Sequence, residues 1–594
     1  MNIESIGADG KRTTASVVVI EPTSAGSSDD PVETSAIDGN KHPAGAGSGS
    51  TSNAIVQKIS DSKRIVNTPF TLTSYVFAMY GPALLTVTIK VLFETQIASF
   101  KMAEPFERLH TADGSSAKES LSSQYLSSSV SFDSLRSAFS GRSIPLWNVI
   151  IYLLITIGAP LSSASMTVQP MNTCDTGGFT KQCQPAWILD LGMLRAMQAL
   201  LVVCMILVLV LVVDSWFYHA GVPANPTSIA SVAVLLNYEP LRHDLQAMDP
   251  EANEKELTQH LNGYHFWLMS HNPSRTETRY GLVHSPVTRP EQAKSGWESF
   301  LHKLEIIKRI AAFESIRTHN VVDGLQLFTV TTLLALLLTY RLNLNNDAFN
   351  YFFASSGFWP RFIMVGLATV IDMQWKNLER EVRITEPYRR MWHGNVGPEH
   401  TILCDLNGTC WSNLPRLLKG IFEAPRELWF EAVVALTAAL SDINIIAVSG
   451  VLMTYSQTKA AYEWSSLTAL TSTSIMLAVV LLTMIWWRRT EGVRCLPRKP
   501  ETIAAVLSYL CSSQMAVELA QVPGIENMSA EERDDIILTQ RKRYRFGLMM
   551  GEDGRERYVI DYDDDELEDD GSSTTRESWL AEKRARPTAI RLSS

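Results

Sequence analysis

The feature that most constrains this chain is a series of apolar runs, each about as long as a bilayer is thick. A helix rises about 1.5 Å per residue, so about 20 residues cross the roughly 30 Å hydrocarbon layer. Tryptophans stand at several run ends, where an aromatic ring can lie between lipid and water. The seven predicted spans are Phe70 to Phe93, Pro145 to Ser163, Ala196 to Val213, Val321 to Tyr340, Tyr351 to Ile371, Trp429 to Met453 and Trp464 to Trp487. We therefore expect a mainly α-helical, polytopic membrane protein.

The chain also repeats itself. VPANPTSIASVAVLL begins at Val222 and LPRKPETIAAVLSYL begins at Leu496, an offset of 274 (496 − 222). Glu94 matches Asp372 at an offset of 278 (372 − 94). A Glu-Pro-aromatic motif, which we interpret as a loop, occurs twice at an offset of 282: Glu104, Pro105 and Phe106, then Glu386, Pro387 and Tyr388. The sequence predicts two halves of three spans each, and the unmatched fourth span lets them lie as parallel repeats.

Each half is followed by a polar segment with the pattern of a small α+β module. In the second copy, Ser529 and Glu532 have capping-box spacing at the start of a predicted helix. Tyr544 to Met549 and Arg555 to Ile560 alternate like strands around a glycine-containing turn, which predicts a hairpin. Each module alone has little core. We expect the two modules to pack on each other or on the membrane face.

Polar flanks and one linker complete the predicted organisation. Residues 1–67 are rich in Ser, Thr, Gly and Ala, a composition typical of disorder. Trp297, Leu301 and Leu304 recur at helical spacing, which fits a helix lying on the bilayer or packed on a module. The predicted divisions are 1–67 disordered tail, 68–217 first membrane half, 218–290 first module, 291–320 amphipathic linker helix, 321–343 linking span, 344–490 second membrane half, 491–562 second module and 563–594 acidic disordered tail.

Lys and Arg predict the orientation, because loops rich in them stay in the cytosol. The Glu-Pro loops and the start of the second module hold most of these residues, whereas the opposite loops hold Lys181, Arg341 and Lys459. This places the N-terminus outside and the C-terminus in the cytosol, at the plasma membrane or an endomembrane. Lys63 and Arg64 argue against it. Much of the net charge of −10 lies in the run from Asp561 to Asp570, so the charge implies nothing about nucleic acid, and we expect no nucleic-acid partner.

The strongest functional hypothesis concerns Asp442 and Asn444, polar residues inside the sixth predicted span. Charge in lipid is costly and is kept mainly where it has a partner. One interpretation is an intramembrane site for a proton or a cation. The other is a buried hydrogen bond between helices, or a carboxylate facing a water-filled gap. Lys90 and Arg361 also fall in spans, and we expect both to snorkel toward the interface.

The cysteines give one further hypothesis. Cys174 and Cys183 share the long loop predicted outside, where they form either a disulfide or two free thiols. Cys404 and Cys410 lack two further ligands at zinc spacing. We therefore expect no metal site, no cofactor and no catalytic residue.

The Glu-Pro-aromatic motif and the Pro-x-x-x-Ile-Ala openings of the modules resemble a fungal family carrying the domain-of-unknown-function label 3433. The second copy, Glu386 to Arg389, fits the family pattern, while Phe106 and Glu107 depart from it. The resemblance implies this architecture and a link to cell-surface growth, without catalytic residues. We expect a non-enzymatic scaffold or sensor embedded in the lipid bilayer, whose paired modules bind cytosolic proteins. The alternative is a transporter or channel with its polar site in the sixth span.

Overall fold

A computed structural model describes most of the chain between residues 72 and 563 and three short strands before it. The described residues are 2–6, 12–16, 63–66, 72–126, 143–170, 185–217, 227–274, 277–286, 318–342, 352–353, 358–406, 408–423, 425–451, 459–489, 496–525, 528–550 and 555–563.

Long helices dominate these residues. They are α1 (Leu72–Leu109), α3 (Ser143–Ser165), α4 (Leu191–Phe217), α10 (Thr318–Leu342), α12 (Phe358–Trp392), α14 (Pro425–Ser449) and α15 (Lys459–Arg489). In the described part of the chain, six helices are long and apolar enough to cross a membrane, or seven if α16 (Ile503–Leu510) and α17 (Gln514–Gln521), bent by 95°, count as one span. The helix predicted from Tyr351 to Ile371 is α12, which is not among the six. Arg361 and Asp372 interrupt its apolar stretch.

The Glu-Pro-aromatic motifs are helical, so the predicted loops are wrong. Glu104 to Phe106 lie inside the 38-residue α1, and Glu386 to Tyr388 lie inside the 35-residue α12. Proline disfavours a helix interior because it lacks an N–H donor and crowds the preceding turn. Here Phe106 and Tyr388 are each at most 1% exposed, and burial of these faces offsets the local preference.

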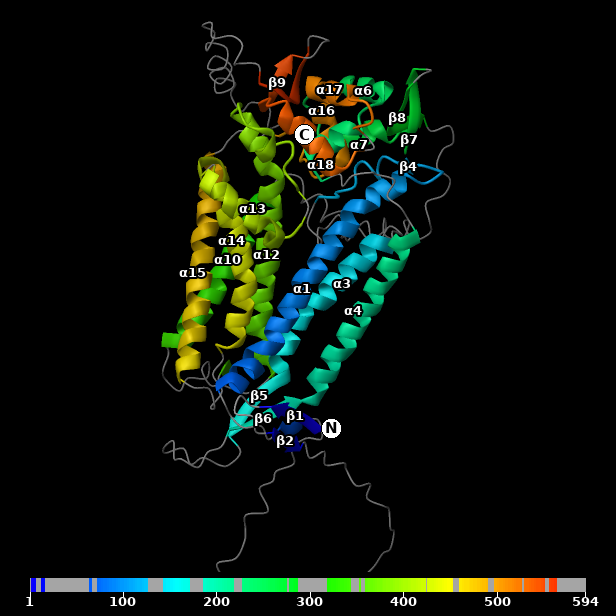
Figure 1. Ribbon diagram of the computed structural model, residues 1–594. Helices are drawn as coiled ribbons and strands as arrows, with labels where there is room; N and C mark the ends of the chain where they lie inside the picture. The colour runs from blue at the N-terminus through cyan, green and yellow to red at the C-terminus, as the bar shows by residue number, and fades with distance from the viewer. Residues whose placement is uncertain are drawn as a thin grey trace, which may run out of the picture. The chain divides into compact units, whose positions relative to one another are not determined.

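The long helices form two groups that touch one another (Figure 1). In one group α3 lies between α1 and α4, and in the other α14 lies between α12 and α15. The groups meet through contacts of α3 with α12 and of α1 with α14. Helix α10 packs on α15 and α12, and the shorter α13 (Cys410–Glu423) packs on α14.

Short helices and hairpins follow α4 and α15. The 227–286 segment contains α5 (Ile229–Val234), α6 (Glu239–Gln246), α7 (Glu254–Leu261), β7 (Tyr264–Ser274) and β8 (Glu277–Pro286). The 496–563 segment contains α16 (Ile503–Leu510), α17 (Gln514–Gln521), α18 (Ala530–Thr539), β9 (Tyr544–Met550) and β10 (Glu556–Tyr562). The predicted capping box at Ser529 and Glu532 is present. Both hairpins are antiparallel, with Phe266 opposite His284 and Phe546 opposite Ile560.

These two segments share one hydrophobic core, so the expected packing on each other is confirmed. Helices α16 and α17 lie among α6 and α7 in Figure 1. The core also takes in the ends of α1 and α12 and parts of the 115–126 and 398–406 stretches, which include the 3-10 helix η1 (Pro398–His400). Leu257, Phe266, Tyr509 and Ile560 are fully buried in it. A joint core removes more apolar surface from water than either segment could alone.

Three smaller strand arrangements complete the fold. In the predicted N-terminal tail, β1 (Asn2–Ile6) pairs with β2 (Arg12–Ser16). Strand β6 (Pro185–Asp190) pairs with β3 (Lys63–Val66) and with β5 (Met166–Pro170). Strand β4 (Ser115–Ser116) joins β7. The rest of the 1–67 tail, most of the 291–320 linker and the 564–594 tail lie outside the described residues.

Candidate functional site

A buried cluster of charges lies where the two helix groups meet. Lys90, from the middle of α1, has a side chain with no exposed surface. It forms an ion pair with Asp372 of α12, and its Nζ lies 3.5 Å from carboxylate oxygens of both Glu94 and Asp442. The prediction that Lys90 snorkels to the interface is therefore wrong. Three carboxylates around one ammonium hold it inside the protein.

Lys376, one turn after Asp372, continues the cluster. Its Nζ lies 2.6 Å from Asp442 and 3.9 Å from Glu94. The indole nitrogen of Trp411, on α13, donates to Asp442 at 2.8 Å, and the Ser441 hydroxyl donates to Asp372 at 2.5 Å. Four helices thus supply the cluster.

Helical spacing explains how the sequence builds this cluster. Lys90 and Glu94 are four residues apart on α1, as are Asp372 and Lys376 on α12, so each pair lies on one helix face. Moving each ion out of water costs several kcal/mol, and its opposite charges must offset that cost. Removing one partner leaves a buried charge uncompensated, so the cluster ties α1 to α12 and α14.

More ion pairs continue along α12 toward its C-terminal end. Arg383 contacts Glu379 at 3.2 Å. Arg390 forms an ion pair with Glu431 of α14 and lies 3.7 Å from Glu386. This alternation of opposite charges is what a structural ion-pair network needs. The cluster around Lys90 also has the groups to hold or pass a proton.

Asp442 and Asn444, singled out together from the sequence, face different neighbours. Two residues along a helix turn the side chain by about 200°, to nearly the opposite face. Asp442 meets Lys90 and Lys376, whereas Asn444 accepts a hydrogen bond from Ser472 of α15 at 2.6 Å. The structure therefore joins Asp442 to α1 and α12, and Asn444 to α15.

Arg361 is also buried, although the sequence predicts that it snorkels. Its side chain donates to the carbonyl of Ser163 on α3 at 3.4 Å, and the residue is 3% exposed. The expectation fails because α3 packs against α12 there, which gives the guanidinium an acceptor inside the protein.

The aromatic residues of the Glu-Pro motifs anchor the long helices in the shared core. Phe106 packs edge-on against Tyr125, with ring centroids 6.1 Å apart. Tyr388 packs edge-on against Tyr509 at 5.9 Å and Phe546 at 5.5 Å. Such edge-to-face pairs stabilise beyond their buried area.

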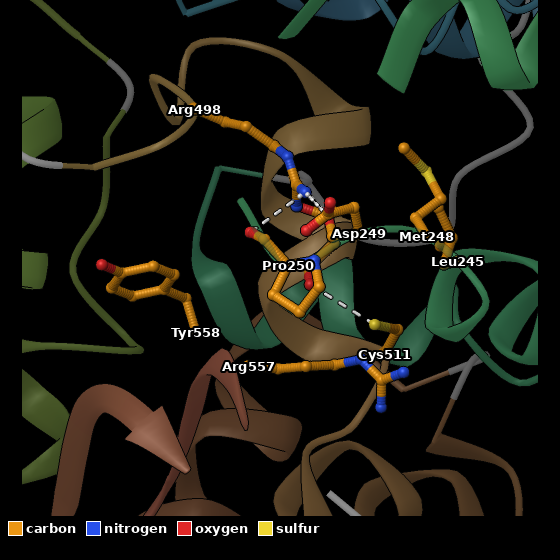
Figure 2. A pocket seen from close by; sticks show the side chains of 9 residues that line it. Leu245, Met248, Asp249, Pro250, Arg498, Cys511, Arg557 and Tyr558 are labelled. Carbon is orange, nitrogen blue, oxygen red and sulfur yellow. Dashed lines mark hydrogen bonds between the residues drawn. The ribbon is translucent and has the colours of Figure 1, made fainter. Parts of the chain in front are cut away.

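A second group of polar contacts joins the 227–286 and 496–563 segments, around a cavity of about 10 Å³ (Figure 2). That volume is about one water molecule, too small for an organic ligand. Arg498 donates to the carbonyls of Ala252 at 2.8 Å and Asp249 at 3.0 Å. Gln246 donates to the carbonyl of Cys511 at 2.8 Å. Burial lowers the pKa of Arg498 and raises the pKa of the Cys511 thiol.

Four other cysteines are candidates from the sequence, and they form two pairs along the chain. Cys174 and Cys183, the candidate disulfide, lie outside the described residues, between β5 and β6. Cys404 and Cys410 are free and buried. Cys404 contacts Arg416 at 3.3 Å, and Cys410 contacts Lys376 at 3.1 Å. Among the described residues no three His, Cys, Asp or Glu side chains gather as metal ligands.

Sequence reasoning found Asp442 but missed its partners. The sequence presents Glu94 and Asp372 only as a repeat match, and Lys90 only as a residue able to snorkel. The available signal was charge at four-residue spacing at the ends of two apolar runs, Lys90 with Glu94 and Asp372 with Lys376. The partners come from helices far apart in the chain, so no local pattern could pair them.

Comparison with known proteins bears on the two helix groups. The family model described as "Protein of unknown function (DUF3433)" matches twice, at residues 76–167 and 358–453. The first match covers most of α1 and all of α3, and the second covers α12, α13 and α14. Neither the curated proteins nor the solved structures contain a match. The family resemblance inferred from the sequence is confirmed, and the chain is similar at two places to the DUF3433 proteins, whose function is unknown.

Proposed function

We propose that this protein is a non-enzymatic membrane scaffold or sensor whose extramembrane part binds cytosolic proteins. Its membrane part is two parallel halves, α1, α3 and α4, then α12, α14 and α15, with α10 as the crossing between them. The 227–286 and 496–563 segments are the two modules. The double family match and the corresponding helix contacts in the two groups support this duplication. Helix α12 serves as a seventh crossing, because its charges find partners inside the protein.

One observation carries the proposal: α1 and α12 run without a break from the charge cluster into the core that both modules share. Phe106 and Tyr388, near the ends of these helices, are buried among module residues. The membrane helices and the modules therefore share buried side chains. Such a construction suits a protein that holds a binding surface at a membrane or passes a change in the membrane to it.

Proximity labelling tests the scaffold role. A labelling enzyme is fused after Ser594 in the wild-type chain and in a variant with Met269→Glu and Met550→Glu. These methionines lie on β7 and at the end of β9 and are 42% and 68% exposed, so charge there changes the surface and leaves the core intact. We expect a set of cytosolic proteins labelled by the wild type and lost in the variant, at equal abundance and membrane location. Identical labelling by both proteins would contradict this binding surface.

The orientation is a separate part of the proposal. A tag at Ser594 should be inaccessible to antibody in intact cells and accessible after the plasma membrane is permeabilised. The number of Lys and Arg residues on the proposed cytosolic side supports this expectation. Labelling in intact cells, or attachment of sugar at the Asn407 sequon, would place the modules on the opposite side.

A transporter is the second candidate, favoured by the buried cluster of Lys90, Asp372, Lys376 and Asp442. Purified protein in vesicles would be tested for a flux of protons or of monovalent cations. A transporter predicts flux that Asp442→Asn abolishes while the protein stays folded. The scaffold predicts no flux above that of empty vesicles, and lower stability in the same variant.

A further inference from the structure

Residues of α1 and α12 that lie at the same sequence distance from the two Glu-Pro motifs contact one another. Lys90 lies 14 residues before Glu104 (104 − 90), and Asp372 lies 14 residues before Glu386 (386 − 372). Both helices are unbroken over these stretches, so Lys90 and Asp372 stand at the same height. The sequence match of Glu94 with Asp372 is displaced by four residues, about one helical turn. Counted from the same two motifs, Glu94 and Lys376 are also corresponding positions.

A two-fold axis parallel to the helices would bring corresponding positions of the two halves into contact. Lys90 touches Asp372, and Glu94 lies 3.9 Å from Lys376. Helix contacts come in exchanged pairs as well: α1 touches α14 while α3 touches α12. In the modules, α5 touches α17 while α16 touches α6. The two halves are therefore related by an approximate two-fold axis that passes beside Lys90 and Asp372.

Backbone hydrogen bonds between the halves follow the same exchange. The stretch after α1 bonds to the second module, since Ala504 donates to the carbonyl of Leu121 at 2.9 Å. The stretch after α12 bonds to the first module, since Ala230 donates to the carbonyl of Ile402 at 3.0 Å. Ala230 and Ala504 are in the first turns of α5 and α16, where N–H groups lack partners within the helix. Each half thus supplies a carbonyl acceptor to an N–H group in the first turn of a helix in the other half.

The charges on the axis have opposite order in the two halves. The first half carries Lys90 then Glu94, and the second carries Asp372 then Lys376. If two first halves met about this axis, Lys90 would face Lys90 and Glu94 would face Glu94. If two second halves met, Asp372 and Lys376 would each face themselves. Like charges in a buried site destabilise strongly, whereas the observed pairing puts opposite charges together.

We infer that these four charges make each half a partner for the other half only, and exclude pairing of a half with its own copy in a second chain. Asp442, which faces both Lys90 and Lys376, adds a carboxylate that only the second half supplies. The inference rests on the proposed duplication and is independent of whether the modules bind other proteins.

A single cysteine on the axis tests the inference in the full chain. Val87 lies three residues before Lys90 on the same face of α1, is 5% exposed, and stands level with Thr369 (369 − 87 = 282). Chains with Val87→Cys are treated in membranes with a short thiol cross-linker. The neutral background combines Lys90→Met, Glu94→Gln, Asp372→Asn, Lys376→Met and Asp442→Asn. Each background without Val87→Cys is the control for native cysteines, and Val87→Cys with Thr369→Cys reports the pairing within one chain.

With native charges we expect no covalent dimer from Val87→Cys and a link within the chain from the two-cysteine variant. In the neutral background we expect Val87→Cys chains to give dimers, because first halves of two chains are then free to meet. If the neutral chains accumulate and still give no dimer, the charges do not select the partner and the inference is wrong.

A charge exchange covers the case in which the neutral chains do not accumulate. Glu94→Lys and Lys376→Glu each place like charges on the axis, and we expect each to lower abundance in the membrane several-fold. The double variant restores opposite charges at this pair and should recover part of that loss. If the abundance of the double variant is as low as the two single losses combined would give, the Glu94–Lys376 pair does not determine which halves pair. The readout needs no module partner, so failure of the scaffold role would leave this result unaffected.

Discussion

The two helix groups, α1 with α3 and α4 and α12 with α14 and α15, share an arrangement of helices but differ in how much protein surrounds them. Helix α4, the last helix of the first half, is the most apolar span, and only 11% of its apolar window is buried. Its counterpart α15 is 39% buried, because α10 packs along it. The second half also has α13 against α14 and more ion pairs along α12. The first group therefore leaves more of its apolar surface uncovered by protein than the second group does.

Breaking the contact between the halves should have the largest effect. Lys90→Met removes the ammonium that faces Asp372, Glu94 and Asp442, and leaves buried carboxylates without it. We expect a loss of about 3–5 kcal/mol in the free energy of unfolding. Unfolding of the purified protein in detergent measures it. Leu92→Met, at a 64% exposed position of the same helix, is the control and should cost less than about 1.5 kcal/mol. Equal losses in both variants would mean that the cluster does not hold the halves together.

The second comparison concerns two arginines, Arg108 and Arg390, at an offset of 282 (390 − 108). Arg390 is buried with Glu431 and Glu386, whereas the Arg108 side chain is 27% exposed and lies 3.0 Å from Glu104. We expect Arg390→Ala to cost about 3 kcal/mol and Arg108→Ala about 1 kcal/mol, because water can replace the exposed partner. The same unfolding assay on the two variants gives the difference. A larger loss of unfolding free energy for Arg108→Ala than for Arg390→Ala would contradict the inference that the second half is the more buried one.

Two glycines near the ends of α1 and α12 offer a closely matched comparison. Gly114 and Gly394 have φ values of +67° and +73°, a region that side chains disfavour by about 1–2 kcal/mol. A Cβ at Gly114 would lie 2.4 Å from the Trp267 ring and 2.8 Å from the Phe266 carbonyl oxygen, whereas a Cβ at Gly394 would lie 2.6 Å from one Asp563 oxygen. Alanine should therefore destabilise at both positions, and more at 114. Gly366→Ala, in a helix with nothing within 4 Å, is the control and should leave melting unchanged or raise it.

The smallest effect concerns pH and the second module alone. Burial opposes ionisation of Glu518, but Lys542 and the Tyr562 hydroxyl, at 2.8 Å, outweigh it and hold its pKa below the usual range. A lowered pKa stabilises the fold above the unfolded value of about 4.3, and the benefit is lost as pH falls through the folded value. Glu518→Gln should therefore lower the melting temperature slightly at pH 7 and by less at pH 3. An equal effect at both pH values would show that the charge of Glu518 does not matter.

The sequence predicted those parts of the protein that local patterns determine. Apolar runs located the long helices, and the capping box at Ser529 located the start of α18. Prediction from the sequence failed where contacts between segments far apart in the chain determine the structure. The Glu-Pro motifs stay helical because Phe106 and Tyr388 are buried in the shared core, where Tyr388 packs against Tyr509 and Phe546, more than 100 residues later in the chain. Lys90 and Arg361 stay buried because helices of the opposite half supply their partners.

The exchanged hydrogen bonds have a consequence for biosynthesis. The carbonyl of Leu121 is made early, but its donor, Ala504, emerges 383 residues later (504 − 121). At about 5–20 residues per second, the ribosome needs roughly 20 to 75 seconds to reach it. Until then the end of α1 and the 227–286 segment leave part of their shared core exposed. A chain that stops before residue 504 therefore lacks α17, β9 and β10, which share one hydrophobic core with α1 and the 227–286 segment.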